Sequence, residues 1–268
     1  MAFLVTKVLM EDVQDMDSLL AAMDKEGFGA DDIVGIAAKT EGNGGVNDFG
    51  RVLVDHLLRE FFVEHGSRTM EQAMEVPIAL SGGCPGFIAP HLNVFATVDD
   101  PDPSGEPRLV VGTSISEAIL PEDVGRPAGV QKIANGVKAA MIDSGIKDPK
   151  DVHYVQTKSP LLSMERIAEA ISRGKTVVTE EANESMPVGN ATAALGIGLA
   201  LGEFEMPRAE QIGKDLDLYS EVASCSTGVE QDEAQIMVVG NKKGAGGRFR
   251  IGHSVMRDAL DIDGIYNV

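Results

Sequence analysis

The 268-residue sequence is long enough to bury a sizeable hydrophobic core, and its length is typical of two domains. A formal net charge of −19 and a sequence pI near 4.6 argue against binding to nucleic acid or to an anionic membrane surface, because both are negatively charged. The two cysteines, the absence of an apolar signal segment and the absence of an apolar run of about 18 residues predict a soluble, reduced, cytoplasmic protein.

The first part of the chain predicts strands that alternate with amphipathic helices. Short apolar runs indicate strands over 3–10, 32–39, 76–83 and 92–98, and a helical period indicates helices over 15–27 and 49–66. The second of these helices is expected to bury one apolar stripe, formed by Val52, Leu53, Leu57, Leu58, Phe61 and Phe62.

The second part of the chain repeats this order. Strands are predicted over 108–114, 152–158 and 235–241, and helices over 130–145, 163–175 and 190–203. This alternation favours an α/β fold with one α/β layer in each unit.

Two local matches show that the two parts are copies of one unit. "DDIVGIAAKT" aligns with "KDVHYVQTKS", which places Lys39 on Lys158 at the end of a strand. "ALSGG" aligns with "SCSTG", which places Ser81 on Ser226 in a Ser-x-Gly turn. The sequence therefore carries a Lys and a Ser in the same order twice.

A third match sets the predicted domain boundaries. "RLVVGTSISEAIL" (108–120) aligns with "RFRIGHSVMRDAL" (248–260), so a further copy is predicted to begin at 248. We expect a first repeat domain over 1–107, a second over 108–247, and over 248–268 the start of a truncated third repeat, with a strand and a short helix over 255–261. The polar segments 99–108 and 241–248 mark the two boundaries.

The repeated residues are those of a serine activated by lysine. A Ser hydroxyl needs a base within hydrogen-bond reach, and a Lys amine can serve when burial or nearby cations lower its pKa. The Gly-containing turns after Ser81 and Ser226 offer backbone N–H groups that can hold an oxyanion. Each feature taken singly also fits a simpler interpretation, in which the Lys is a solvated strand end and the Ser-Gly pair an ordinary turn.

Five segments together resemble the ring-opening amidohydrolases, the family of cyanuric acid hydrolase and barbiturase. The resemblance covers essentially the whole chain, and the first segment is long enough to be specific. These segments are "KTEGNGGVNDFGR" (39–51), "LSGG" (80–83), "VQTKSPLL" (155–162), "ESM" (184–186) and "ASCSTGVE" (223–230).

The resemblance implies three homologous domains around a pseudo-threefold axis, with a central cavity for a planar cyclic imide or ureide. It implies Ser226 as the nucleophile and Lys158 as its base, in a hydrolase that cleaves the C–N bond of a cyclic amide without a metal or an organic cofactor. The residues implied to bind substrate are Lys39, Arg51, Ser81, Gly82, Thr227 and Asn190.

The sequence departs from the family pattern in two ways. Asn190 stands where the family carries an Arg, so a charged ligand for a ring carbonyl is replaced by a shorter neutral amide. The third domain is missing beyond its first segment, so we expect a separate small subunit to supply the third wall of the cavity and the protein to form an oligomer. The alternative is a non-catalytic binding or assembly subunit of such an enzyme.

Overall fold

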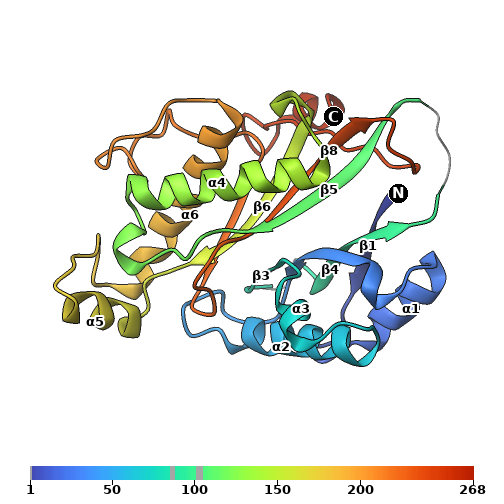
Figure 1. The fold of residues 1–268 in the computed structure, drawn as a ribbon, viewed down its shortest axis with the longest axis horizontal. Helices are drawn as coiled ribbons and strands as arrows, with labels where there is room; N and C mark the ends of the chain where they lie inside the picture. The colour runs from blue at the N-terminus through green and yellow to red at the C-terminus, as the bar shows by residue number, and fades with distance from the viewer. Residues whose placement is uncertain (1, 85–87, 101–104) are drawn as a thin grey trace.

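The computed structural model describes residues 2–84, 88–100 and 105–268, and within these ranges the strands form two four-stranded sheets (Figure 1). We call the first sheet and its helices the first unit, and the second sheet and its helices the second unit. The first unit contains β1 (Ala2–Leu9), α1 (Asp17–Glu26), β2 (Ile33–Lys39), α2 (Phe49–Glu64), α3 (Met70–Met74), β3 (Ile78–Ser81) and β4 (His91–Val98).

The second unit contains β5 (Pro107–Ile115), α4 (Pro127–Ser144), β6 (Val152–Pro160), α5 (Met164–Ser172), α6 (Ala182–Leu201), β7 (Ala223–Gly228) and β8 (Gln235–Lys243). Short 3-10 turns are η1 (Ala30–Asp32), η2 (Pro121–Asp123) and η3 (Pro149–Asp151), and a short helix α7 (Ile262–Tyr266) follows the second unit.

The two sheets have the same topology. The strand order is β1-β4-β2-β3 in the first and β5-β8-β6-β7 in the second, so each strand has a counterpart at the same position. In each sheet the central pair is antiparallel and the last pair, β2 with β3 or β6 with β7, is parallel. This identity of order confirms the predicted α/β fold of repeated units.

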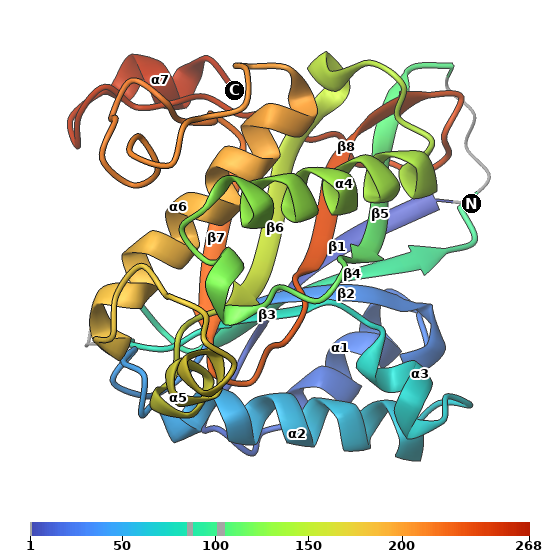
Figure 2. The same cartoon turned by 60° about the vertical axis from the view of Figure 1, so that its left-hand side comes forward.

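The helices cover the outer faces of the sheets, and the inner faces pack on each other. Figures 1 and 2 show α1, α2 and α3 on the first sheet, and α4 and α6 on the second. Because side chains alternate along a strand, Ile236 and Val238 of β8 lie in the core under the helices, whereas Met237 and Val239 lie between the sheets. Ala37 and Phe95 of the first sheet join that inter-sheet layer.

The buried face of α2 differs from the predicted stripe. Val52 and Leu53 are exposed, and two arginines, Arg51 and Arg59, are buried in their place beside Val54. Arg59 is buried because its guanidinium donates hydrogen bonds to the carbonyl oxygens of Ala73 and Val76 and pairs with Asp55. Apolar periodicity cannot predict such burial, because it depends on backbone acceptors from another segment.

Two elements of the second unit also differ from the prediction. β7 is absent from the predicted strands because its sequence, "ASCSTG", is small and polar rather than apolar. α6 begins at Ala182, eight residues before the predicted start, so Asn190 lies inside the helix. No helix in the described part of the chain, α6 included, is long and apolar enough to cross a membrane.

The predicted strand and short helix of a third repeat are not formed. Residues 249–255 have no regular structure, residues 257–260 form bends and turns, and the short helix lies later, at α7. The backbone of this segment instead forms hydrogen bonds with the second unit. The Phe249 carbonyl oxygen accepts from the Leu109 N–H, and the Asn241 side-chain amide bonds both the N–H and the carbonyl oxygen of Ile251. The domain boundaries stay predictions. Residues 101–104, which belong to the segment that marks the first boundary, lie outside the described residues.

Besides the layer between the sheets, the two units also meet along a seam formed by β3 of the first and by β6, β7 and the start of β8 of the second. At this seam the buried side chain of Gln235 accepts a hydrogen bond from the Ile78 N–H at 2.9 Å. One backbone N–H of the edge strand β3 is therefore hydrogen-bonded by a side chain of the neighbouring unit.

We predict that Gln235→Leu lowers the free energy of unfolding by about 1–3 kcal/mol, because the Ile78 N–H loses its acceptor. Urea denaturation followed by circular dichroism measures this change. Gln131→Leu is the matched control, because Gln131 is exposed and its side chain donates to its helix neighbour Asn135 on the surface. Its effect is expected to stay within about 0.5 kcal/mol. Equal stability of both variants would contradict the role of Gln235 at the seam.

Candidate active site

The register of the parallel strand pairs places each repeated Lys beside its Ser. Lys39 on β2 is opposite Ser81 on β3, and Lys158 on β6 is opposite Ser226 on β7. Opposed residues on adjacent parallel strands project to the same face of the sheet. The repeat in the sequence is therefore also a repeat in space.

The first pair is partly exposed. Lys39 Nζ donates to Ser81 Oγ at 3.2 Å and to the Gly82 carbonyl oxygen at 2.7 Å. Asp48, which caps the N-terminus of α2, shapes this turn: a Cβ on Gly82 would lie 1.9 Å from Asp48 Oδ2. A larger residue at 82 would therefore displace the Asp48 carboxylate from its position at the start of α2.

In the second pair the lysine is buried, whereas Ser226 is partly exposed. The Lys158 side chain is 1% exposed, and its Nζ donates to Ser226 Oγ at 3.3 Å and to the Thr227 carbonyl oxygen at 3.2 Å. It also donates across the seam to the Leu80 carbonyl oxygen at 3.0 Å, and it forms an ion pair with Glu230 Oε1 at 3.0 Å. Four oxygens thus surround an ammonium that has three protons.

The surroundings of Lys158 shift the pKa values of both members of the ion pair. Burial lowers the pKa of Lys158, although Glu230 acts in the opposite direction, and the nearby Arg51 lowers it further. Burial acts to raise the pKa of Glu230, but the charge of Lys158, hydrogen bonding and Arg51 outweigh it, so the pKa is lowered overall. A buried amine with a lowered pKa is the property that a general base in this position requires.

The remaining implied site residues lie around these two pairs. Arg51 is buried in the first turn of α2, where it donates to the Gly45 carbonyl oxygen at 2.8 Å, and its charge acts on Lys158 without a direct hydrogen bond. Asn190 makes no hydrogen bond with the two pairs in the described structure; its neighbour Gly189 approaches Thr227, since a Cβ on it would lie 2.8 Å from Thr227 Cγ2.

Several of these polar atoms are buried and have no partner within the described ranges. They include Thr227 Oγ1, Asn190 Oδ1 and Arg51 Nε. Buried polar groups without partners are uncommon, so these atoms are candidates for contacts with a ligand.

Two participants were not predicted from the sequence. The Leu80 carbonyl oxygen accepts from both Lys158 Nζ and Ser226 Oγ, the latter at 3.2 Å, and this contact depends on the docking of the units. Glu230 could have been found, because it ends the segment "ASCSTGVE", four residues after Ser226. The repeat does not show it, because the residue four positions after Ser81 is Pro85.

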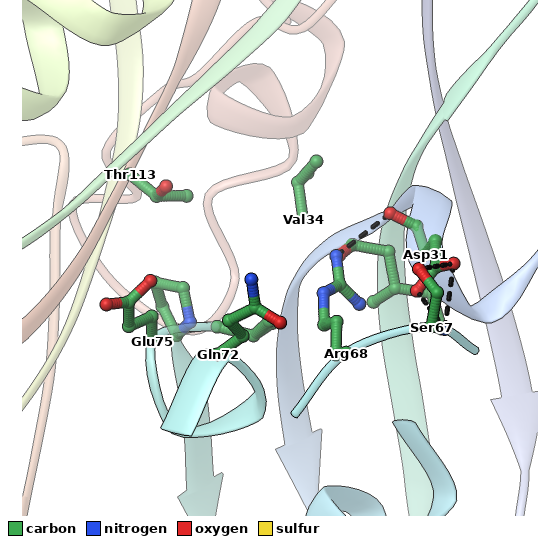
Figure 3. A pocket seen from close by; sticks show the side chains of 10 residues that line it. Asp31, Val34, Ser67, Arg68, Gln72, Glu75 and Thr113 are labelled. Carbon is green, nitrogen blue, oxygen red and sulfur yellow. Dashed lines mark hydrogen bonds between the residues drawn. The ribbon is translucent and has the colours of Figure 1, made fainter. Parts of the chain in front are cut away.

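A separate groove of about 480 Å³ lies at the start of β2, whereas Lys39 lies at the end of that strand, roughly 20 Å away. Figure 3 shows Asp31, Ser67 and Arg68 close together in this groove, where Ser67 donates to the Asp31 carboxylate and Arg68 donates to the Asp31 carbonyl oxygen. Its lining contains none of the repeated Lys and Ser residues, so the seam is the better candidate for the active site.

Comparisons with known proteins agree with this assignment of the fold. The model of the amidohydrolase ring-opening protein family matches residues 4–268. Barbiturase 2 from Nocardioides sp. is 54% identical over 264 residues, which cover 98% of this chain and 71% of that protein. A cyclic amide hydrolase from Azorhizobium caulinodans is 38% identical, over 97% of this chain and 72% of that protein.

A solved structure gives the same result. The crystal structure of cyanuric acid hydrolase from A. caulinodans superposes with a TM-score of 0.92 at 35% identity, over 99% of this chain and 74% of that chain. The chain thus belongs to the amidohydrolase ring-opening family, and about a quarter of the length of these relatives has no counterpart in its 268 residues.

Proposed function

We propose that this protein hydrolyses a cyclic amide, a planar imide or ureide of the barbituric or cyanuric acid type, with Ser226 as the nucleophile and Lys158 as its base. The observation that carries the proposal is the contact between the buried Lys158 amine and Ser226 Oγ at 3.3 Å. The names of the relatives, barbiturase and cyclic amide hydrolase, support the substrate class.

The proposed reaction begins when Lys158 takes the proton of Ser226 and Oγ attacks a ring carbonyl carbon. Backbone N–H groups near Ser81–Gly82 and Ser226–Thr227 stabilise the charge that develops on the carbonyl oxygen. Lys158 then returns the proton to the ring nitrogen as the C–N bond breaks, and water releases the acyclic product from Ser226. These steps require neither a metal nor an organic cofactor.

The first unit has a binding role in this proposal. The carbonyl and N–H groups of the ring are held by Lys39, Ser81, Gly82 and the buried Arg51 of the first unit, together with Asn190 and Thr227 of the second. Lys39 is more exposed than Lys158, and no carboxylate pairs with it in the described part of the structure, so its amine suits a hydrogen-bond donor better than a base.

We further propose that a third unit completes the cavity, carried either by this polypeptide or by a separate small subunit. An apolar groove of about 340 Å³ opens at the layer between the sheets, and its lining includes Phe95, Leu109, Tyr154 and Phe249. A sheet from a third unit would cover these side chains, and the unmatched quarter of the relatives is long enough to supply one.

We predict that Ser226→Ala and Lys158→Ala each lower the kcat for ring opening of barbituric acid by at least about 10³-fold. The repeat offers matched controls: Ser81→Ala and Lys39→Ala are expected to raise KM and to keep kcat within about tenfold, because they remove binding interactions. Steady-state kinetics of the assembled protein, that is, the 268-residue protein together with the third unit, measure both parameters. Loss of kcat in the first-unit variants, with kcat retained in the second-unit variants, would reverse the assignment.

We predict that the 268-residue protein alone opens the ring at least about 10²-fold more slowly than the same protein co-expressed with the C-terminal quarter of a barbiturase relative. Native mass spectrometry of the co-expressed sample determines whether a complex forms and how many copies it contains. Full activity of the 268-residue protein alone would contradict the requirement for a third unit. Complex formation without turnover would favour a binding or assembly role.

A further inference from the structure

Glu230 makes the two Lys-Ser pairs chemically different. Both pairs have nearly the same spacing, 3.2 Å in the first and 3.3 Å in the second. Only the second has a carboxylate in contact with its lysine among the described residues, at 3.0 Å from Lys158 Nζ. At the corresponding position the first unit has Pro85, which carries no ionisable group.

The protein backbone makes space for this carboxylate. A Cβ on Gly228 would lie 2.2 Å from both carboxylate oxygens of Glu230, so only glycine leaves room for the side chain to reach Lys158. The Glu230 side chain is 15% exposed, and its Oε2 is buried without a hydrogen-bond partner in the described structure. A carboxylate oxygen that keeps a free lone pair can accept a proton.

The ion pair raises a difficulty for catalysis by Lys158. An ammonium cannot take the proton of Ser226, and the contact with Glu230 favours the ammonium form of Lys158. Moving one proton over the 3.0 Å from Nζ to Oε1 removes this difficulty, because it converts the ion pair into a neutral amine and a neutral carboxylic acid. Binding of a planar substrate over the pair excludes water and favours the neutral form.

We propose that Glu230 is a positioning residue that stores the proton of Lys158 while the Lys158 amine activates Ser226. The inference rests on the proposed function. The proton first moves from Lys158 to Glu230, and the Ser226 proton then moves to Lys158 as Oγ bonds to the carbonyl carbon. Lys158 delivers that proton to the leaving nitrogen, and Glu230 returns its own proton to Lys158, so the pair ends with the single proton with which it began.

The pH dependence of kcat distinguishes this role from a structural one. In the wild type the pair becomes inactive only when it holds two protons, which occurs below the pKa of Glu230, itself lowered from its ordinary value of 4.5. In Glu230→Gln the active form requires a neutral Lys158, so activity on the acid side is lost at the pKa of Lys158 instead. Even deeply buried lysines rarely titrate below about pH 5–6, so the acid limb is expected to move up by at least about one pH unit.

The test is the pH profile of kcat with barbituric acid, measured on the assembled protein for the wild type, Glu230→Gln, Glu230→Asp and Glu233→Gln. Glu230→Asp is expected to restore an acid limb near that of the wild type. Glu233→Gln, the same change of charge on an exposed residue of the same loop, is expected to leave the profile unchanged. An acid limb in Glu230→Gln that coincides with that of the wild type would overturn the proposal.

A second measurement does not depend on turnover. The pKa of Lys158, followed through the ¹³Cε resonance of labelled lysine in the 268-residue protein, is expected to fall by about 1–3 units in Glu230→Gln. An unchanged pKa of Lys158 would also overturn the role of Glu230. Ser226→Ala distinguishes a failure of the proposed function from a failure of the role of Glu230. If that variant kept its kcat, the proposed function itself would fail, whatever Glu230 does.

Discussion

Burial of the Lys158 ammonium is the constraint on which the rest of the site depends. A charge taken out of water costs several kcal/mol unless its partners replace the lost hydration. The partners of Lys158 come from both units: Ser226, Thr227 and Glu230 from the second, and the Leu80 carbonyl oxygen from the first. The ammonium is therefore satisfied only when the two units are docked, which links the packing of the seam to the chemistry that we propose for it.

The repeat supplies one scaffold twice, but it does not supply the same chemistry twice. The strand order, the register and the Lys-Ser spacing are common to the two units. The differences lie in burial and charge, because Lys39 is partly exposed while Lys158 is enclosed beside Glu230 and near Arg51. In the function that we propose, one fold carries a binding pair and a reactive pair, in agreement with the general observation that function depends on the site and not on the fold.

Much of this arrangement could be predicted from the sequence, because it depends on local pattern. The strand that ends at Lys39 and the matching strand that contains Lys158 follow from short apolar runs, and the repeat places each Lys beside its Ser. What could not be predicted depends on long-range packing. The contact of Lys158 with Leu80 requires the position of a segment 78 residues away in the chain. The burial of Arg59 and the bonding of Ile251 to Asn241 require the position of another segment 14 and 10 residues away, which local periodicity does not describe.

The most direct test of the central claim is mass spectrometry of the protein after acid quench during turnover of barbituric acid. Attack by Ser226 predicts a covalent acyl adduct on the peptide that contains this residue, with none on the peptide that contains Ser81. An adduct on Ser81 would show that the pair of the first unit is the reactive one. Turnover without an adduct on either serine would contradict covalent catalysis by a Lys-Ser pair.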